Sequence, residues 1–176
     1  MPDHTRGIET EPPVSARRVV DLSHVIRDGL VTYPGLPAEV FHLTDVAPGG
    51  EGRRDIPAEV FFDRDLRGAA VLLHTGWDTR FGTAAYGTGS PYLSSAGVEH
   101  LVAQGVALVG IDALNIDDTG SGGERPAHSG LLAAGIHIVE HLTRLGDLPP
   151  RGARFTAAPP AVEGFGTFPV RAFALV

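Results

Sequence analysis

The 176-residue chain contains no cysteine and no lysine, and it has one methionine and one tryptophan. Without cysteine it forms no disulfides and no thiolate zinc sites, which fits a reducing cytoplasm. All fourteen basic residues are arginine, and the net charge is −7 with a pI near 5.5. Short pairs such as Arg17-Arg18 are the densest basic clusters. This charge pattern excludes the basic surface of a nucleic-acid-binding protein.

Long apolar runs are also missing. No segment reaches the roughly 20 consecutive apolar residues that a membrane helix needs, and the N-terminal region lacks the apolar core of a signal peptide. We therefore expect a soluble, cytoplasmic protein with no membrane partner. Hydrophobic residues make up 43% of the chain and charged residues 20%, which is typical of globular proteins. The length suits one domain with a sizeable core.

Residues 1–17 are polar and contain three prolines, which predicts a flexible arm before a single domain over residues 18–176. Apolar runs in that domain predict strands at 18–22, 69–73, 106–111, 136–140, 155–158 and 170–175. A helix is expected from Ser94 or Ser95 to Gly105, and a short helical turn at 131–134. The polar segment Asn115 to Glu124 is expected to be a mobile loop. This alternation of strands and helices predicts an α/β fold.

Two metal-capable side chains lie twelve residues apart, His128 and Glu140. Gly135 lies between them and prevents one helix from carrying both, so folding must bring them together. In the alternative interpretation His128 caps a turn, Glu140 begins the next helix, and neither binds a ligand. His137 alternates with Ile136 and Ile138, so it faces away from Glu140 if this segment is extended.

A catalytic zinc site normally takes three protein ligands and leaves one position for water. His128 and Glu140 would supply two of them. The third ligand stays open among His24, His74, Asp112 and Asp117, because no spacing favours one of the four. Nucleophile-elbow and P-loop motifs are absent. No catalytic residue is assigned from the sequence.

The single tryptophan, Trp77, follows His74 just after the apolar run 69–73. Functional loops of α/β proteins commonly follow such strands. Trp77 and His74 are therefore candidates to line a pocket for a planar substrate. The alternative interpretation is that Trp77 is a core residue.

Several segments, in this order, resemble the cyclase family, which includes bacterial kynurenine formamidase and isatin hydrolase. They are Asp21-Leu22-Ser23-His24, Tyr33-Pro34-Gly35, Leu73-His74-Thr75-Gly76-Trp77, Val109-Gly110-Ile111-Asp112, Ala127-His128, Ile138-Val139-Glu140-His141-Leu142 and Phe168-Pro169-Val170-Arg171-Ala172. The resemblance implies a swivelling β/β/α fold with a mixed sheet or barrel. It also implies a homo-oligomer and a divalent metal, zinc or manganese, that activates water for amide hydrolysis. His128 and Glu140 match two of the family's metal-site positions.

The family's His-x-Gly-Thr-His-x-Asp-x-Pro-x-His signature is absent between Pro34 and Val71. That interval is shortened, with the gap best placed around residues 43–54, so the N-terminal half of the domain is reduced. Three explanations stay open: a degenerate member that binds a ligand without hydrolysis, a site rebuilt with other groups or across an oligomer interface, and an internal deletion.

The sequence thus predicts a metal-dependent hydrolase of amide (arylformamide) or lactam bonds in small aromatic substrates, with a degenerate metal site. The alternative is a pseudoenzyme that serves as a ligand-binding or assembly subunit. A small molecule is the expected partner in either case. The substrate, the metal and the third ligand are not determined by the sequence.

Overall fold

The computed structural model describes residues 18–22, 53–158 and 167–176. The predicted arm at 1–17 and most of the shortened interval at 43–54 lie outside these ranges. The strands are β1 (Val19–Asp21), β2 (Asp55–Ile56), β3 (Ala70–Leu73), β4 (Tyr92–Leu93), β5 (Leu108–Ile111), β6 (His137–Val139), β7 (Arg154–Ala158) and β8 (Arg171–Leu175). The helices are α1 (Ser95–Gln104) and α2 (Pro126–Ala133), with 3-10 turns η1 (Ala58–Phe61), η2 (Trp77–Arg80), η3 (Ala84–Gly87) and η4 (Leu145–Asp147).

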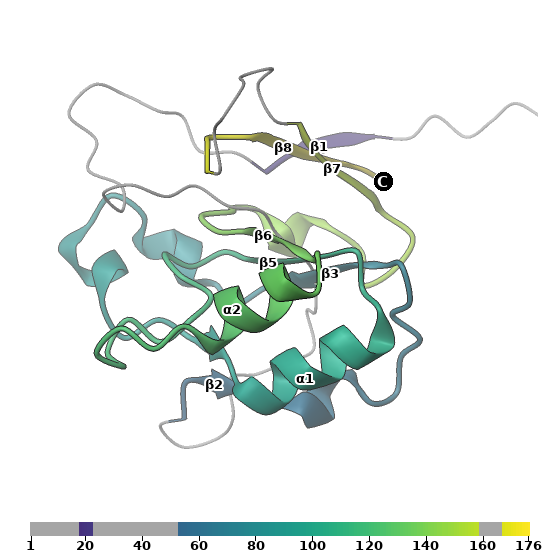
Figure 1. Cartoon of the computed structure of the whole chain (residues 1–176). Coiled ribbons are helices and arrows are strands. Elements are labelled where there is room, and N and C mark those ends of the chain that lie inside the picture. The colour runs from purple at the N-terminus through teal and green to yellow at the C-terminus, as the bar shows by residue number, and fades with distance from the viewer. Residues whose placement is uncertain (1–17, 23–52, 159–166) are drawn as a thin grey trace, which may run out of the picture.

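The described elements form layers (Figure 1). Strands β3, β5 and β6 make a parallel sheet in the order β3-β5-β6, and β1, β8 and β7 make an antiparallel sheet in the order β1-β8-β7. The helices lie on one side of the parallel sheet and the antiparallel sheet lies on the other. Strands β2 and β4 form a short parallel pair. The mixed α/β prediction is confirmed, but the described strands form separate sheets and no closed barrel.

The parallel sheet is covered on both faces, which explains the continuous apolar runs of β3 and β5. Val71, Leu73, Val109 and Ile111 are each at most 2% exposed. In this sheet Val71 pairs with Val109, which in turn pairs with Ile138. The parallel register brings the carboxyl ends of all three strands to one edge of the sheet.

Local interactions explain both ends of α1 and the start of α2. The Ser94 hydroxyl accepts a hydrogen bond from the backbone N–H of Gly97, and α1 ends at Gly105, whose φ of 68° is left-handed. Pro126 occupies the first turn of α2, where a missing N–H costs nothing. The helices pack closely, because a Cβ added to Gly130 would lie 2.6 Å from Val98 Cγ1.

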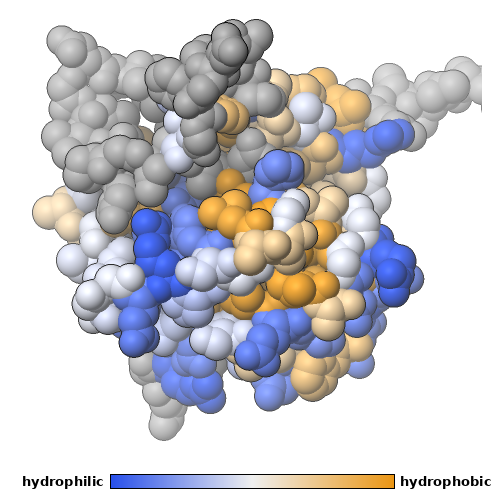
Figure 2. Space-filling model, viewed as in Figure 1, coloured by the Kyte–Doolittle hydropathy of each residue, from blue (hydrophilic) through white to orange (hydrophobic). Residues whose placement is uncertain are grey.

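Apolar surface gathers over the helices on the face seen in Figure 2. Leu132 of α2 is one of the large hydrophobic residues that are exposed, at 55%. Within the described residues, no helix combines the length and apolar character that crossing a membrane requires.

Candidate functional site

Buried polar side chains gather where the parallel strands end. Asp112 directly follows β5 and Glu140 directly follows β6, and both are at most 5% exposed. Asn115 and Asp117 lie in the segment after β5 and are equally buried. The sequence predicted a mobile loop from Asn115 onward, whereas its first three residues are packed inside the protein. The carboxyl edge of a parallel sheet is where α/β proteins most often bind ligands.

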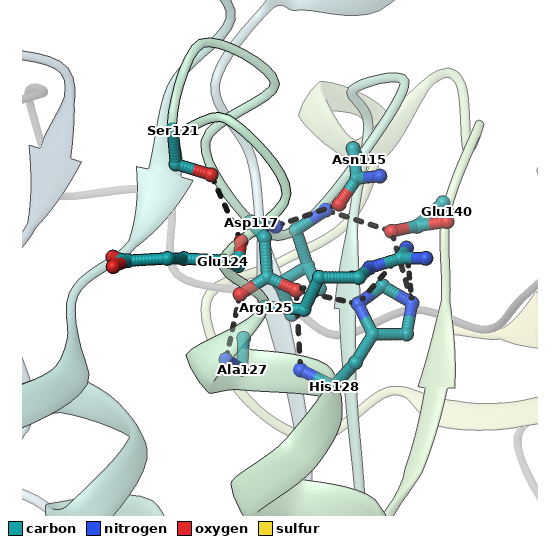
Figure 3. Close-up of polar contacts among 9 residues, drawn as sticks. Asn115, Asp117, Ser121, Glu124, Arg125, Ala127, His128 and Glu140 are labelled. Atoms are coloured by element: carbon teal, nitrogen blue, oxygen red, sulfur yellow. Dashed lines mark hydrogen bonds and ion pairs between the residues drawn. The ribbon is translucent and has the colours of Figure 1, made fainter.

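His128 lies between two carboxylates at this edge (Figure 3). Its Nδ1 atom lies 2.6 Å from Oδ2 of Asp117, and its Nε2 atom lies 3.7 Å from Oε1 of Glu140. A carboxylate only accepts hydrogen bonds, so Nδ1 carries the proton in the contact with Asp117. In the neutral imidazole, Nε2 then keeps a lone pair that faces the Glu140 side. Metal-binding histidines are commonly oriented by such a carboxylate.

Asp117 fixes this arrangement from the start of α2. Its Oδ1 accepts the backbone N–H of Ala127 at 2.6 Å, and its Oδ2 accepts the N–H of His128 at 3.2 Å. The carboxylate therefore accepts hydrogen bonds from N–H groups in the first turn of α2. Its negative charge also interacts favourably with the positive end of the helix dipole. The Asn115 side chain holds the loop in turn, because its Oδ1 accepts the N–H of Asp117 at 2.8 Å.

Glu140 is almost completely enclosed, with a side chain 2% exposed. Its Oε1 accepts the backbone N–H of Ile116 at 2.7 Å. Burial raises the pKa of Glu140 from 4.5 to about 7, although His128 and the Ile116 N–H oppose the shift. A carboxyl group with this pKa can hold or release a proton near neutral pH.

Trp77 and His74 occupy the segment after β3. The Trp77 indole N–H donates to the Tyr86 carbonyl at 3.1 Å, and the Arg80 guanidinium covers its ring at 3.9 Å. His74 lies beside the η4 turn, where a Cβ on Gly146 would come within 3.1 Å of its ring. Their predicted role in substrate binding stays a proposal.

Tyr86 connects this aromatic segment to the acidic edge. Its hydroxyl lies 3.0 Å from Nδ1 of His141, the residue after Glu140, and its ring makes an edge contact with Phe81. Burial raises the pKa of the Tyr86 hydroxyl, and the charges of Asp112 and Glu140 add to the shift. The phenol therefore stays protonated at neutral pH beside the two carboxylates.

The candidates for a third metal ligand differ in their surroundings. Both Asp112 oxygens accept N–H or hydroxyl hydrogen bonds from Thr75 and Gly76, and burial raises the pKa of this carboxyl. The Asp117 carboxylate already accepts hydrogen bonds from the backbone of α2 and from the His128 ring. His24 lies outside the described residues. Within those residues no group of three histidine or acidic side chains could hold a metal.

The His128 and Glu140 pair nevertheless fits two corners of a metal site. Two ligands about 2.1 Å from one ion at a tetrahedral angle are about 3.4 Å apart. The observed separation of 3.7 Å between Nε2 and Oε1 is close to that value. The described residues thus supply two donors with suitable spacing.

Sequence reasoning missed Arg125 and underestimated Asp117. The Nη2 atom of Arg125 lies 3.3 and 3.4 Å from the two ring nitrogens of His128. An arginine directly before a helix that begins Pro-Ala-His is a weak sequence signal. The direction of the Arg125 side chain depends on the turn between Glu124 and Pro126.

Three kinds of comparison bear on the family. The Cyclase family model, described as "Putative cyclase", matches residues 59–118. No curated protein matches the chain. A potential metal-dependent hydrolase with cyclase activity superposes with a TM-score of 0.69 at 21% identity, covering 91% of this chain and 98% of that one.

Two further solved structures are similar. A predicted metal-dependent hydrolase from Bacillus stearothermophilus has a TM-score of 0.68 at 20% identity, covering 92% of this chain and 99% of that one. Isatin hydrolase A from Ralstonia solanacearum has a TM-score of 0.66 at 28% identity, covering 80% of this chain. The match spans 60% of that isatin hydrolase. Taken together, the family model and these structures support a cyclase-family assignment, with the family model matching about a third of the chain.

Proposed function

We propose that this protein is a hydrolase that opens amide (arylformamide) or lactam bonds of small aromatic molecules with the help of a divalent metal. The observation that carries the proposal is the approach of His128 Nε2 to Glu140 Oε1 at 3.7 Å, with Asp117 fixing the tautomer of the imidazole. The similarity to isatin hydrolase supports a small cyclic amide as the substrate class.

His128 and Glu140 would hold the ion, which supplies Lewis-acid chemistry that polarises a carbonyl and lowers the pKa of water. Asp117 keeps the imidazole in the orientation that this needs. Trp77 would line the aromatic side of the substrate, and His74 would lie near it. Tyr86 stays neutral and can donate a hydrogen bond.

The experiment is metal analysis of the protein purified without a histidine tag, with turnover of an arylformamide and of isatin. We expect one bound zinc or manganese per chain and measurable hydrolysis. His128→Ala removes a donor and should lose the metal. His137→Ala, on the exposed side of β6, is the matched control and should retain it.

A second candidate function follows from the number of donors. The described residues offer two ligands where catalytic zinc sites take three. A non-catalytic subunit that binds a small molecule would need no third ligand. Less than about a tenth of an equivalent of metal, with no turnover of either substrate, would favour this candidate over the hydrolase.

Assembly as a homo-oligomer in the cytoplasm is a further part of the proposal. Light scattering of the purified chain tests it, and a monodisperse monomer would contradict it.

A further inference from the structure

Arg125 is a charged residue beside the site to which the proposed chemistry gives no role. It directly precedes α2, and in Figure 3 its side chain reaches across His128 on the side of Glu140. The side chain is 32% exposed, so a small molecule arriving from solvent can contact it. It therefore brings a permanent positive charge to the edge of the site.

The hydrogen-bond donors of Arg125 have only weak partners among the described residues. Nη2 lies 3.4 Å from Nδ1 of His128 and 3.3 Å from Nε2, and Nε lies 3.9 Å from Oδ2 of Asp117. The Nδ1 atom cannot accept a hydrogen bond, because it donates its own proton to Asp117. The Asp117 carboxylate is already occupied by three N–H groups. A guanidinium carries five N–H donors, and most of those on Arg125 have no acceptor among the residues that the structure describes.

Other arginines in the chain show what a satisfied guanidinium looks like. Arg54 donates two hydrogen bonds of 2.9 and 2.8 Å to the two carboxylate oxygens of Asp118, and Arg53 likewise donates to both oxygens of Asp55. This forked geometry matches the two oxygens of a carboxylate. Among the described residues Arg125 has no carboxylate partner of this kind, although it lies beside the residues proposed for chemistry.

We propose that Arg125 determines specificity at this site by binding the carboxylate of an anionic aromatic ligand. This inference rests on the proposed function for the location of the site and extends it by naming the ligand's charge. The helix N-terminus does not compete for the anion, because Asp117 already occupies the N–H groups of Ala127 and His128. The guanidinium supplies a forked pair of N–H donors for the carboxylate.

Equilibrium binding to the full chain tests the inference without requiring turnover. Anthranilate and 2-aminobenzamide are matched probes, because they differ in a carboxylate against a neutral amide. We expect the wild type to bind anthranilate at least about ten-fold more tightly, which corresponds to about 1.4 kcal/mol. Arg125→Gln should remove that preference and leave 2-aminobenzamide binding within about two-fold. Arg125→Lys should keep part of the preference for anthranilate, because lysine retains the positive charge but lacks the paired N–H donors of the guanidinium.

Arg53→Gln is the control, because Arg53 is an exposed arginine paired with Asp55. It should bind both probes as the wild type does, and circular dichroism checks that each variant is folded. Equal affinity of the wild type for the two probes, binding of neither probe, or an unchanged preference in folded Arg125→Gln would each overturn the inference. Arg125-dependent binding without metal or turnover would instead uphold it while the hydrolase proposal fails.

Discussion

The two main sheets handle charge in opposite ways. At the carboxyl edge of the parallel sheet, Asp112, Asp117 and Glu140 are buried and held by backbone N–H groups. In the antiparallel sheet, Arg171 of β8 pairs with Asp21 of β1 at the surface, with side chains 68% and 41% exposed. Burying a carboxylate costs free energy that a surface pair avoids. Buried acids at the parallel edge are what the proposed site would require.

The largest effect should come from Asp117→Ala. The change leaves two backbone N–H groups and the His128 imidazole without their acceptor, so we expect a loss of about 4 kcal/mol in the free energy of unfolding. Urea unfolding measures it. Asp118→Ala, one residue further along, is the matched control, because its carboxylate is more exposed and should cost far less. Equal losses in the two variants would break the contrast between buried and exposed acids.

The next effect is the pH dependence that Glu140 imposes on the metal-free protein. Its pKa rises from 4.5 in the unfolded chain to about 7 in the folded one, so the folded state binds the proton more tightly. The contribution of Glu140 to the free energy of unfolding is therefore fully present below pH 4.5 and is lost as the pH rises towards and through 7. The decline should be on the order of 3 kcal/mol.

Glu140→Gln is the reference for that measurement, because a neutral amide cannot titrate in this range. Urea unfolding of both proteins in EDTA should show the wild type losing stability relative to the variant across this range. Parallel pH profiles would mean that Glu140 ionises as a solvated acid does.

An intermediate effect is expected at the half-exposed pair of Arg54 and Asp118, whose side chains are 37% and 21% exposed. Their mutual hydrogen bonds raise the pKa of Arg54 and lower that of Asp118. Arg54→Gln should cost about 1 kcal/mol, and less in high salt. Thermal unfolding at two ionic strengths tests this. A loss of stability that does not depend on salt would instead indicate that Arg54 acts by packing on the Tyr92 ring.

The smallest effect should be Arg171→Gln in the antiparallel sheet. Solvent screens this exposed pair, so the free energy of unfolding should change by less than about 0.5 kcal/mol. Urea unfolding again measures it. A loss comparable to that of Asp117→Ala would remove the distinction between the two sheets.

The sequence was a good guide to elements and a weaker guide to contacts. Apolar runs and the glycines at 105 and 135 located the strands and helix ends, because those features are local. The break at Gly135 also indicated that His128 and Glu140 meet only through folding. The contacts of Asp117 and Arg125 depend on side-chain directions set by the loop between β5 and α2. Polarity alone predicts exposure for such a loop, and so it hid the burial of Asn115 and Asp117.

Strand β8 lies between β1 and β7, although it follows both of them in the chain. The pairing of Val20 with Ala174 closes a loop of nearly the whole domain. Such distant pairings are entropically expensive to form and slow folding. We therefore expect the helices and the parallel sheet to assemble first, with β1 added only once β8 is in place. Peptide-level hydrogen exchange during refolding would reveal β1 as the last strand to gain protection.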